Sequence, residues 1–120
     1  MADKNMVIFT RTFDFLSWLL PLTNHFPRAH RHTVTRRLLD AAFDFFERIQ
    51  AANFRMGPRR KEMLTAADES LANLRMYMRM ALRWKWINDG QYRHGGTMIA
   101  EIGRLLGGWQ KSVKPEQRLK

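Results

Sequence analysis

Three arginines recur at every fourth position near the middle of the chain: Arg75, Arg79 and Arg83. On a helix this spacing places the side chains along one stripe. A planar guanidinium group binds a phosphate or a carboxylate through two parallel hydrogen bonds. The stripe therefore indicates a binding surface for phosphates or for a protein partner. The alternative is a solvated face on which Arg75 and Arg79 pair with Asp68, Glu69 or neighbouring acids.

The histidines are the only side chains that suggest catalysis: His25, His30, His32 and His94. His30 and His32, together with His94, could bind a metal or cut RNA with the help of arginine. However, no group of carboxylates accompanies them, and no Ser-His-Asp order or phosphate-binding Gly loop is present. We therefore expect no enzymatic activity, no catalytic residue, no metal and no cofactor.

Basic residues outnumber acidic ones by 21 to 11, which leaves a net charge of +10. Such an excess favours a polyanionic partner, with nucleic acid ahead of a membrane, unless it serves solubility alone. The absence of Cys excludes disulfides and thiolate metal sites and fits a cytoplasmic protein. The longest apolar run, residues 13–22, is interrupted by Asp14, Ser17 and Pro21, so we predict no membrane span.

The arginine stripe lies in a stretch, residues 61–86, that contains no Gly or Pro and many strong helix formers. Its apolar residues recur at alternating steps of three and four positions, as on the packing face of a helix: Leu64, Ala67, Leu71, Leu74, Met78 and Ala81. Acids precede bases along the stretch, which complements the helix dipole. We predict a helix over residues 59–88.

Three further helices are predicted, over about 6–25, 31–53 and 91–113, with Pro21 expected to kink the first. Their apolar positions are Phe9, Phe13, Leu16 and Leu20 in the first, Val34, Leu38, Ala41, Ala42, Phe45 and Ile49 in the second, and Met98, Ile102, Leu105 and Trp109 in the last. Four amphipathic helices with short turns predict an all-α, antiparallel up-down-up-down four-helix bundle in one domain, residues 1–120. Residues 114–120 form a basic tail.

Both ends of this bundle are expected to be basic. The first and third connections share one end, which would gather Arg28, His30, Arg31, His32, Arg83, Lys85, Arg93 and His94. The other end would gather Arg55, Arg59, Arg60, Lys61, Lys111 and Lys114.

The helix predicted over residues 59–88 carries more apolar residues than one packing face can bury. Five of them lie outside the apolar face that runs from Leu64 to Ala81: Met76, Tyr77, Met80, Trp84 and Trp86. We therefore predict a ring-like homo-oligomer in which Trp84 and Trp86 contact another subunit. Gly103 and Gly107 are expected on one side of the last helix, where two backbones could approach closely.

Three segments resemble one known family: WLLPLTNHFPRAHRHT (18–33), ADESLANLRMYMRMA (67–81) and IAEIGRLLGGWQKS (99–112). They are similar to the accessory variability determinant proteins of diversity-generating retroelements over about residues 15–113. The positions that match the family pattern are Arg75, Arg79, Glu101, Gly103, Arg104, Gly107 and Trp109, with Arg28 and Arg31 matching less closely. Related bundle proteins, including those encoded in ribosomal RNA intervening sequences, share much of this pattern.

The resemblance implies a non-enzymatic partner of a reverse transcriptase. Family members form a basic pentameric barrel that binds the polymerase and RNA or DNA while a template repeat is copied with errors into a variable gene. The alternative is a stand-alone RNA-binding or toxin-type bundle with His/Arg nuclease chemistry.

Overall fold

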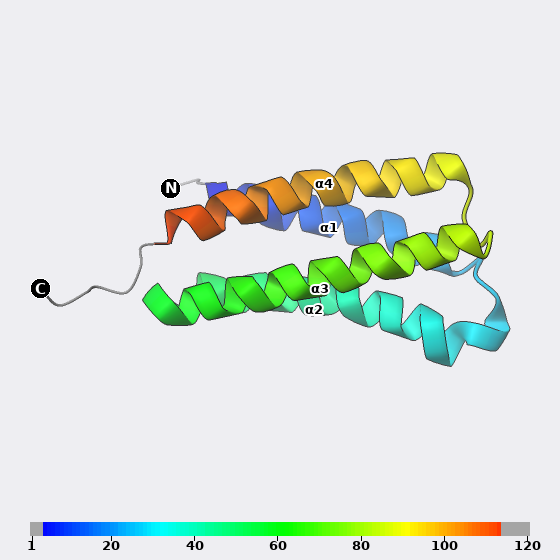
Figure 1. Cartoon of the computed structure of the whole chain (residues 1–120), viewed down its shortest axis with the longest axis horizontal. Coiled ribbons are helices and arrows are strands. Elements are labelled where there is room, and N and C mark those ends of the chain that lie inside the picture. Colours follow the sequence, from blue (N-terminus) through cyan, green and yellow to red (C-terminus); the bar gives the residue numbers. More distant parts are fainter. Residues whose placement is uncertain (1–3, 114–120) are drawn as a thin grey trace, which may run out of the picture.

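The computed structural model describes the backbone of residues 4–113 and the side chains of residues 7–113; the predicted basic tail, with Lys114, lies outside these ranges. The structure contains four long helices, and each runs antiparallel to the one before it in the chain (Figure 1): α1 (Lys4–Thr23), α2 (Arg36–Asn53), α3 (Gly57–Arg83) and α4 (Asp89–Ser112). The described chain contains no strand. The predicted all-α four-helix architecture is confirmed.

Each helix packs against its neighbours in the chain, and α4 closes the bundle by packing against α1. The most extensive contact joins α2 and α3. In Figure 1 the α1–α2 and α3–α4 connections lie at one end, and the α2–α3 connection lies at the other. The helices therefore follow the predicted up-down-up-down order. The candidate site lies at the end where the α1–α2 and α3–α4 connections meet.

The packing stripe predicted for α3 is confirmed, because all six of its residues are buried: Leu64, Ala67, Leu71, Leu74, Met78 and Ala81. Gly57 begins the helix with a φ of 59°, a left-handed conformation that favours glycine, and Pro58 follows in the first turn. The helix ends at Arg83 rather than at residue 88 as predicted.

The packing face predicted for α1 is partly wrong. Phe13 and Leu20 are 60% and 40% exposed, whereas the buried face consists of Ile8, Thr12, Phe15, Leu16 and Leu19. The sequence pattern favoured the wrong face because apolar residues occur on most sides of this helix. Burial of Thr12 is tolerated since its hydroxyl donates a hydrogen bond of 2.7 Å to the Ile8 carbonyl.

The α1–α2 connection also differs from the prediction. The α-helix begins at Arg36, after a 3₁₀ turn, η1 (Arg28–His30), and a π-helical turn, η2 (Arg31–Thr35). The Thr35 hydroxyl is buried and has no hydrogen-bond partner within residues 7–113. The basic residues of this segment therefore lie on a compact turn and not on the regular first turns of α2.

One glycine of α4 is required by packing. A Cβ at Gly95 would lie 2.9 Å from two ring atoms of Trp18 and 3.1 Å from the Met78 methyl group. Trp18 also contacts the His94 ring at 5.3 Å between centroids. Gly95 thus allows the indole of α1 to lie directly against α4. A Cβ at Gly107, by contrast, would meet no atom within 4 Å.

These two glycines provide a matched test of the packing. Gly107→Ala should stabilise the protein by up to about 1 kcal/mol, since alanine is the better helix former. Gly95→Ala gains the same helix propensity, but overpacking against Trp18 should lower the free energy of unfolding by about 1–3 kcal/mol. Thermal unfolding followed by circular dichroism should therefore give Gly95→Ala the lower Tm. Equal Tm values would contradict the Trp18 contact.

Candidate nucleic-acid interface

The turn after α3 is built around Lys85, which has a φ of 65°. The Lys85 N–H donates to the Leu82 carbonyl at 2.9 Å, and the Trp86 N–H donates to the Ala81 carbonyl at 2.8 Å. This pair of bonds is the Schellman arrangement, which ends a helix with one left-handed residue. Trp84 and Trp86 therefore leave the helix. The prediction that both lie within a helix extending to residue 88 is wrong.

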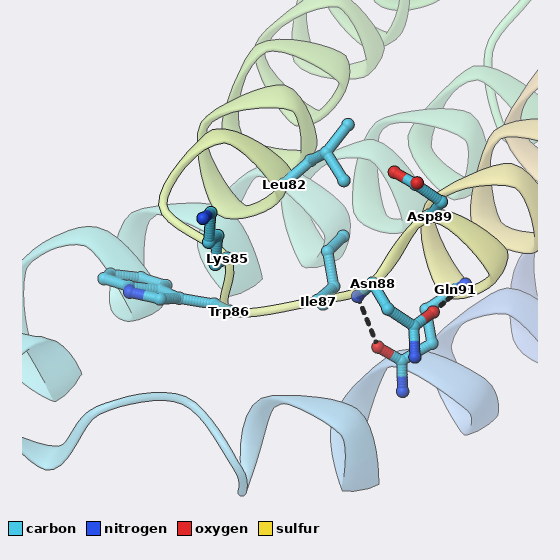
Figure 2. A pocket seen from close by; sticks show the side chains of 7 residues that line it. All are labelled: Leu82, Lys85, Trp86, Ile87, Asn88, Asp89 and Gln91. Carbon is cyan, nitrogen blue, oxygen red and sulfur yellow. Dashed lines mark hydrogen bonds between the residues drawn. The ribbon is translucent and has the colours of Figure 1, made fainter.

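The other side of the turn is fixed by a capping box (Figure 2). The Gln91 N–H donates to the Asn88 side chain at 2.7 Å, and the Asn88 N–H donates to the Gln91 side chain at 2.9 Å. The Asn88-x-x-Gln91 pattern was the sequence signal that places the helix start at Asp89, before the predicted position. In Figure 2 the Trp86 indole points away from this box, and Trp86, Asn88 and Gln91 all line a recess of about 610 Å³.

Trp86 joins the two connections at this end of the bundle. The centroid of its ring lies 5.3 Å from that of the buried Phe26 and 5.5 Å from that of His30, and the planes of the His30 and Trp86 rings differ by only 16°. Trp84, which precedes Lys85 in the chain, has its ring centroid 5.2 Å from that of Trp86. We call these four residues, Phe26, His30, Trp84 and Trp86, the aromatic end. The sequence analysis placed His30 at this end but did not predict that it stacks on Trp86.

Exposed basic residues accompany the aromatic end on the same connections and the adjoining helix ends: Arg28, Arg31, Arg83, Lys85 and Arg93. None of their side chains forms an ion pair or hydrogen bond within residues 7–113. Their charges are therefore not neutralised by acids in this part of the chain. Such groups can receive phosphates without first breaking an internal bond.

The arginine stripe of α3 is also unpaired. Arg75, Arg79 and Arg83 are exposed, and no ion pair joins them to any acid in residues 7–113. The alternative of pairing with Asp68 and Glu69 is thus not observed. On α4, Arg104 is exposed and likewise makes no ion pair with a described side chain.

Gly103 makes room for an arginine of the stripe. A Cβ at this position would lie 2.7 Å from Nη2 of Arg75, so the guanidinium group lies across the α4 backbone. Two helix backbones were expected to approach closely at Gly103, but the close contact there is between the Arg75 side chain and the α4 backbone. The close approach expected at Gly107 is not present within the described chain.

Other basic residues stabilise the fold. Arg11 forms an ion pair of 3.0 Å with Glu101, which joins α1 to α4. Arg60 donates to the Ala52 carbonyl at 2.9 Å, at the end of α2, and its guanidinium group lies 5.8 Å from the Trp109 ring centroid. Trp109 itself is buried, at 6% exposure, in the core of its own bundle. The second basic end is thus partly occupied with internal contacts.

The histidines do not form a metal site in the described chain. No group of three or more His, Asp or Glu side chains there is placed to hold an ion. His30 stacks on Trp86, and His94 contacts Trp18, so two of the four histidines make ring contacts instead. Within the described residues, no helix combines the length and the apolar character needed to cross a bilayer.

A family model described as bAvd-like matches residues 6–113. The chain belongs to the bAvd-like family. These are the accessory variability determinants of diversity-generating retroelements, so the resemblance of the three segments is confirmed and extends further toward the N-terminus. Membership implies an accessory role in such an element, generally without catalysis, and suggests association with a reverse transcriptase.

The bundle is also similar to a solved structure. The crystal structure of a protein of unknown function from the S23 ribosomal protein family of Bacteroides thetaiotaomicron has a TM-score of 0.83 to this chain. The match covers 92% of this chain and 100% of that one at 16% identity, so it shows the fold alone. No match to a curated protein was found.

The left-handed Lys85 gives a test of the turn that ends α3. A residue with a Cβ is disfavoured in this conformation by about 1–2 kcal/mol, and glycine removes that cost from the folded state. Part of the resulting gain in stability is lost, because glycine also makes the unfolded state more flexible. Lys85→Gly should therefore stabilise the protein by about 0.5–1 kcal/mol, measured by urea unfolding. Lys85→Ala removes the same charge but keeps the Cβ, and it should leave stability nearly unchanged. If Lys85→Gly and Lys85→Ala stabilise the protein equally, the effect comes from the loss of the lysine charge and not from the backbone conformation.

Proposed function

We propose that this bAvd-like protein binds reverse transcriptase and nucleic acid through its basic surface and thereby supports mutagenic copying of a template repeat into a variable gene. The observation that carries the proposal is the set of exposed arginines without internal partners, on the outer side of α3 and at the aromatic end. Nothing in the described chain neutralises them, so they are available to a polyanion or to an acidic protein surface.

Binding of this kind is expected to be electrostatic and only weakly specific for sequence. The exposed basic groups contact phosphates, and each neutralised phosphate releases condensed counterions. The amino-acid sequence carries no recognition-helix motif for reading base edges, and arginine dominates the unpaired set. RNA and DNA are both suitable ligands. The protein itself performs no chemistry on them, and the polymerase supplies the reaction.

The arginine stripe is tested by the double variant Arg75→Gln, Arg79→Gln. If both residues contact phosphate, the log-log slope of affinity against salt should become less steep by about 0.7–0.9 for each arginine that bound a phosphate. If they bind the polymerase instead, the slope should stay unchanged while the protein no longer captures its reverse transcriptase. Fluorescence anisotropy with labelled RNA and a pull-down measure the two outcomes.

A control variant separates the stripe from overall charge. Arg36→Gln, Arg55→Gln also removes two charges, but Arg36 pairs with Asp40, and Arg55, in the α2–α3 turn, donates to the Ala51 carbonyl of α2. This control should change both readouts less than the stripe variant does. If the stripe variant retains both the slope and the polymerase, the stripe is a solvated face and the proposal for it is wrong.

We also propose that the protein assembles into a ring of identical subunits, a homopentamer as the family resemblance implies. Apolar side chains remain exposed on two helices that lie diagonally across the bundle: Phe13 (60%) and Leu20 (40%) on α1, and Met76 (44%) on α3. Two different faces on one subunit can form a heterologous contact, which closes into a ring when the rotation permits. After the turn at Lys85, Trp84 and Trp86 no longer belong to this outer face of α3.

Light scattering at micromolar protein tests the assembly. The expected mass is several times the 14.3 kDa of one chain, and five times that value for the pentamer. Met76→Glu and Phe13→Glu should each lower the mass, because a charge in a buried contact is costly. Phe54→Glu, at an exposed loop position with 76% exposure, serves as the control and should not. A monomeric wild-type protein would contradict the proposal.

A further inference from the structure

The aromatic end carries an exposed ring surface that the bundle does not use. Trp84 is 45% exposed, and His30 is also exposed, although both contact Trp86. A cleft of about 240 Å³ lies between them, lined by His30, Val34, Trp84 and Trp86. Three of these four lining residues are planar rings, so the cleft suits a flat ligand with a π-face.

The rings of this cleft are held in place before any ligand arrives. Trp86 packs against the buried Phe26, and the turn that carries it is fixed by the two hydrogen bonds to Ala81 and Leu82 on one side and the Asn88–Gln91 capping box on the other. The parallel arrangement of His30 on Trp86, at 16°, shows that planar groups already stack here. A pre-organised surface of this kind loses little conformational entropy on binding.

The surrounding charge identifies the class of ligand. The five unpaired basic residues Arg28, Arg31, Arg83, Lys85 and Arg93 lie on the connections and helix ends that form this end of the bundle, whereas Asp89 is the acid that lines the recess on the other side of the turn. An apolar protein segment would gain nothing from so many cations. A nucleotide supplies both a π-face for the rings and a phosphate for the bases.

We propose that the aromatic end is a stacking site for an unpaired base of single-stranded nucleic acid, with the neighbouring basic residues holding the flanking phosphates. The base stacks on Trp84 in the cleft beside His30 and Trp86. A base inside a duplex is already stacked on its neighbours and cannot enter, so the site selects single strands or single-stranded loops. This inference rests on the proposed nucleic-acid binding and adds to it a selectivity that charge alone does not provide.

The test compares Trp84→Ala with the wild-type protein, using a fluorescein-labelled, unstructured RNA of about 12 nucleotides and a blunt duplex of the same sequence. Removing one stacking partner should weaken single-strand binding by about 5- to 150-fold, while the salt slope stays the same because every phosphate contact remains. Duplex affinity should not change. Trp84→Phe keeps a ring and should restore most of the affinity, and Phe54→Ala, which removes an exposed ring at the other end, should have no effect.

Several outcomes would overturn the inference. If Trp84→Ala binds the single strand as tightly as the wild-type protein, or weakens single strand and duplex equally, then no base stacks there. If the variant instead has a lower mass by light scattering, a second copy of the chain occupies the cleft. In each of these cases the stacking site is wrong, but the proposed function is still supported if the wild-type protein binds RNA in a salt-dependent way. A wild-type protein that binds neither RNA would contradict both.

Discussion

α3 buries one continuous stripe, from Leu64 to Ala81, against the rest of the bundle, and this burial determines where every other surface of the helix points. Fully burying a single leucine contributes about 1.5–3 kcal/mol, whereas an exposed ion pair contributes at most about 1 kcal/mol. The bundle is therefore stabilised mainly by its apolar core. The same helical period that buries Leu74 and Met78 leaves Arg75, Arg79 and Arg83 exposed, and none of the three forms an ion pair within the described chain.

The basic residues divide into two groups with different roles. Arg11, Arg48 and Arg60 make defined internal contacts: Arg11 with Glu101, Arg48 with Asp44 and the buried Ser70, and Arg60 with the end of α2 and the Trp109 ring. The exposed arginines of α3, of α4 and of the aromatic end make no ion pair with a described acid, whereas on α2 the exposed Arg36 pairs with Asp40. A high net charge by itself could serve only solubility. Its concentration on residues without internal partners is what favours a polyanionic or acidic partner.

The turn at Lys85 converts part of the α3 sequence into a different kind of surface. Had the helix continued to residue 88, Trp84 would have extended the face of Met76 and Met80, and Trp86 would have lain close to the face of Arg79. Because Lys85 adopts a left-handed conformation, Trp86 instead meets the α1–α2 connection, where it stacks with His30 and contacts the Phe26 ring, and Trp84 contacts Trp86. One backbone conformation thus separates the outer face of α3 from the aromatic end.

The sequence by itself determined the four helices, their order, the α3 core stripe and the collection of basic residues at the shared end. Each of these follows from local information: the spacing of apolar residues, the Gly and Pro breaks, and the short connections that force antiparallel neighbours. The Asn88-x-x-Gln91 pattern was equally local and would have corrected the predicted start of α4. Tertiary structure decided the remainder. The buried face of α1 was ambiguous because Phe13 and Leu20 compete with Phe15 and Leu19, and only contact with α2 and α4 selects between them. Likewise, neither the fit of Trp18 against Gly95 nor the stack of His30 on Trp86 has a signature in sequence spacing, because each joins segments brought together only when the bundle closes.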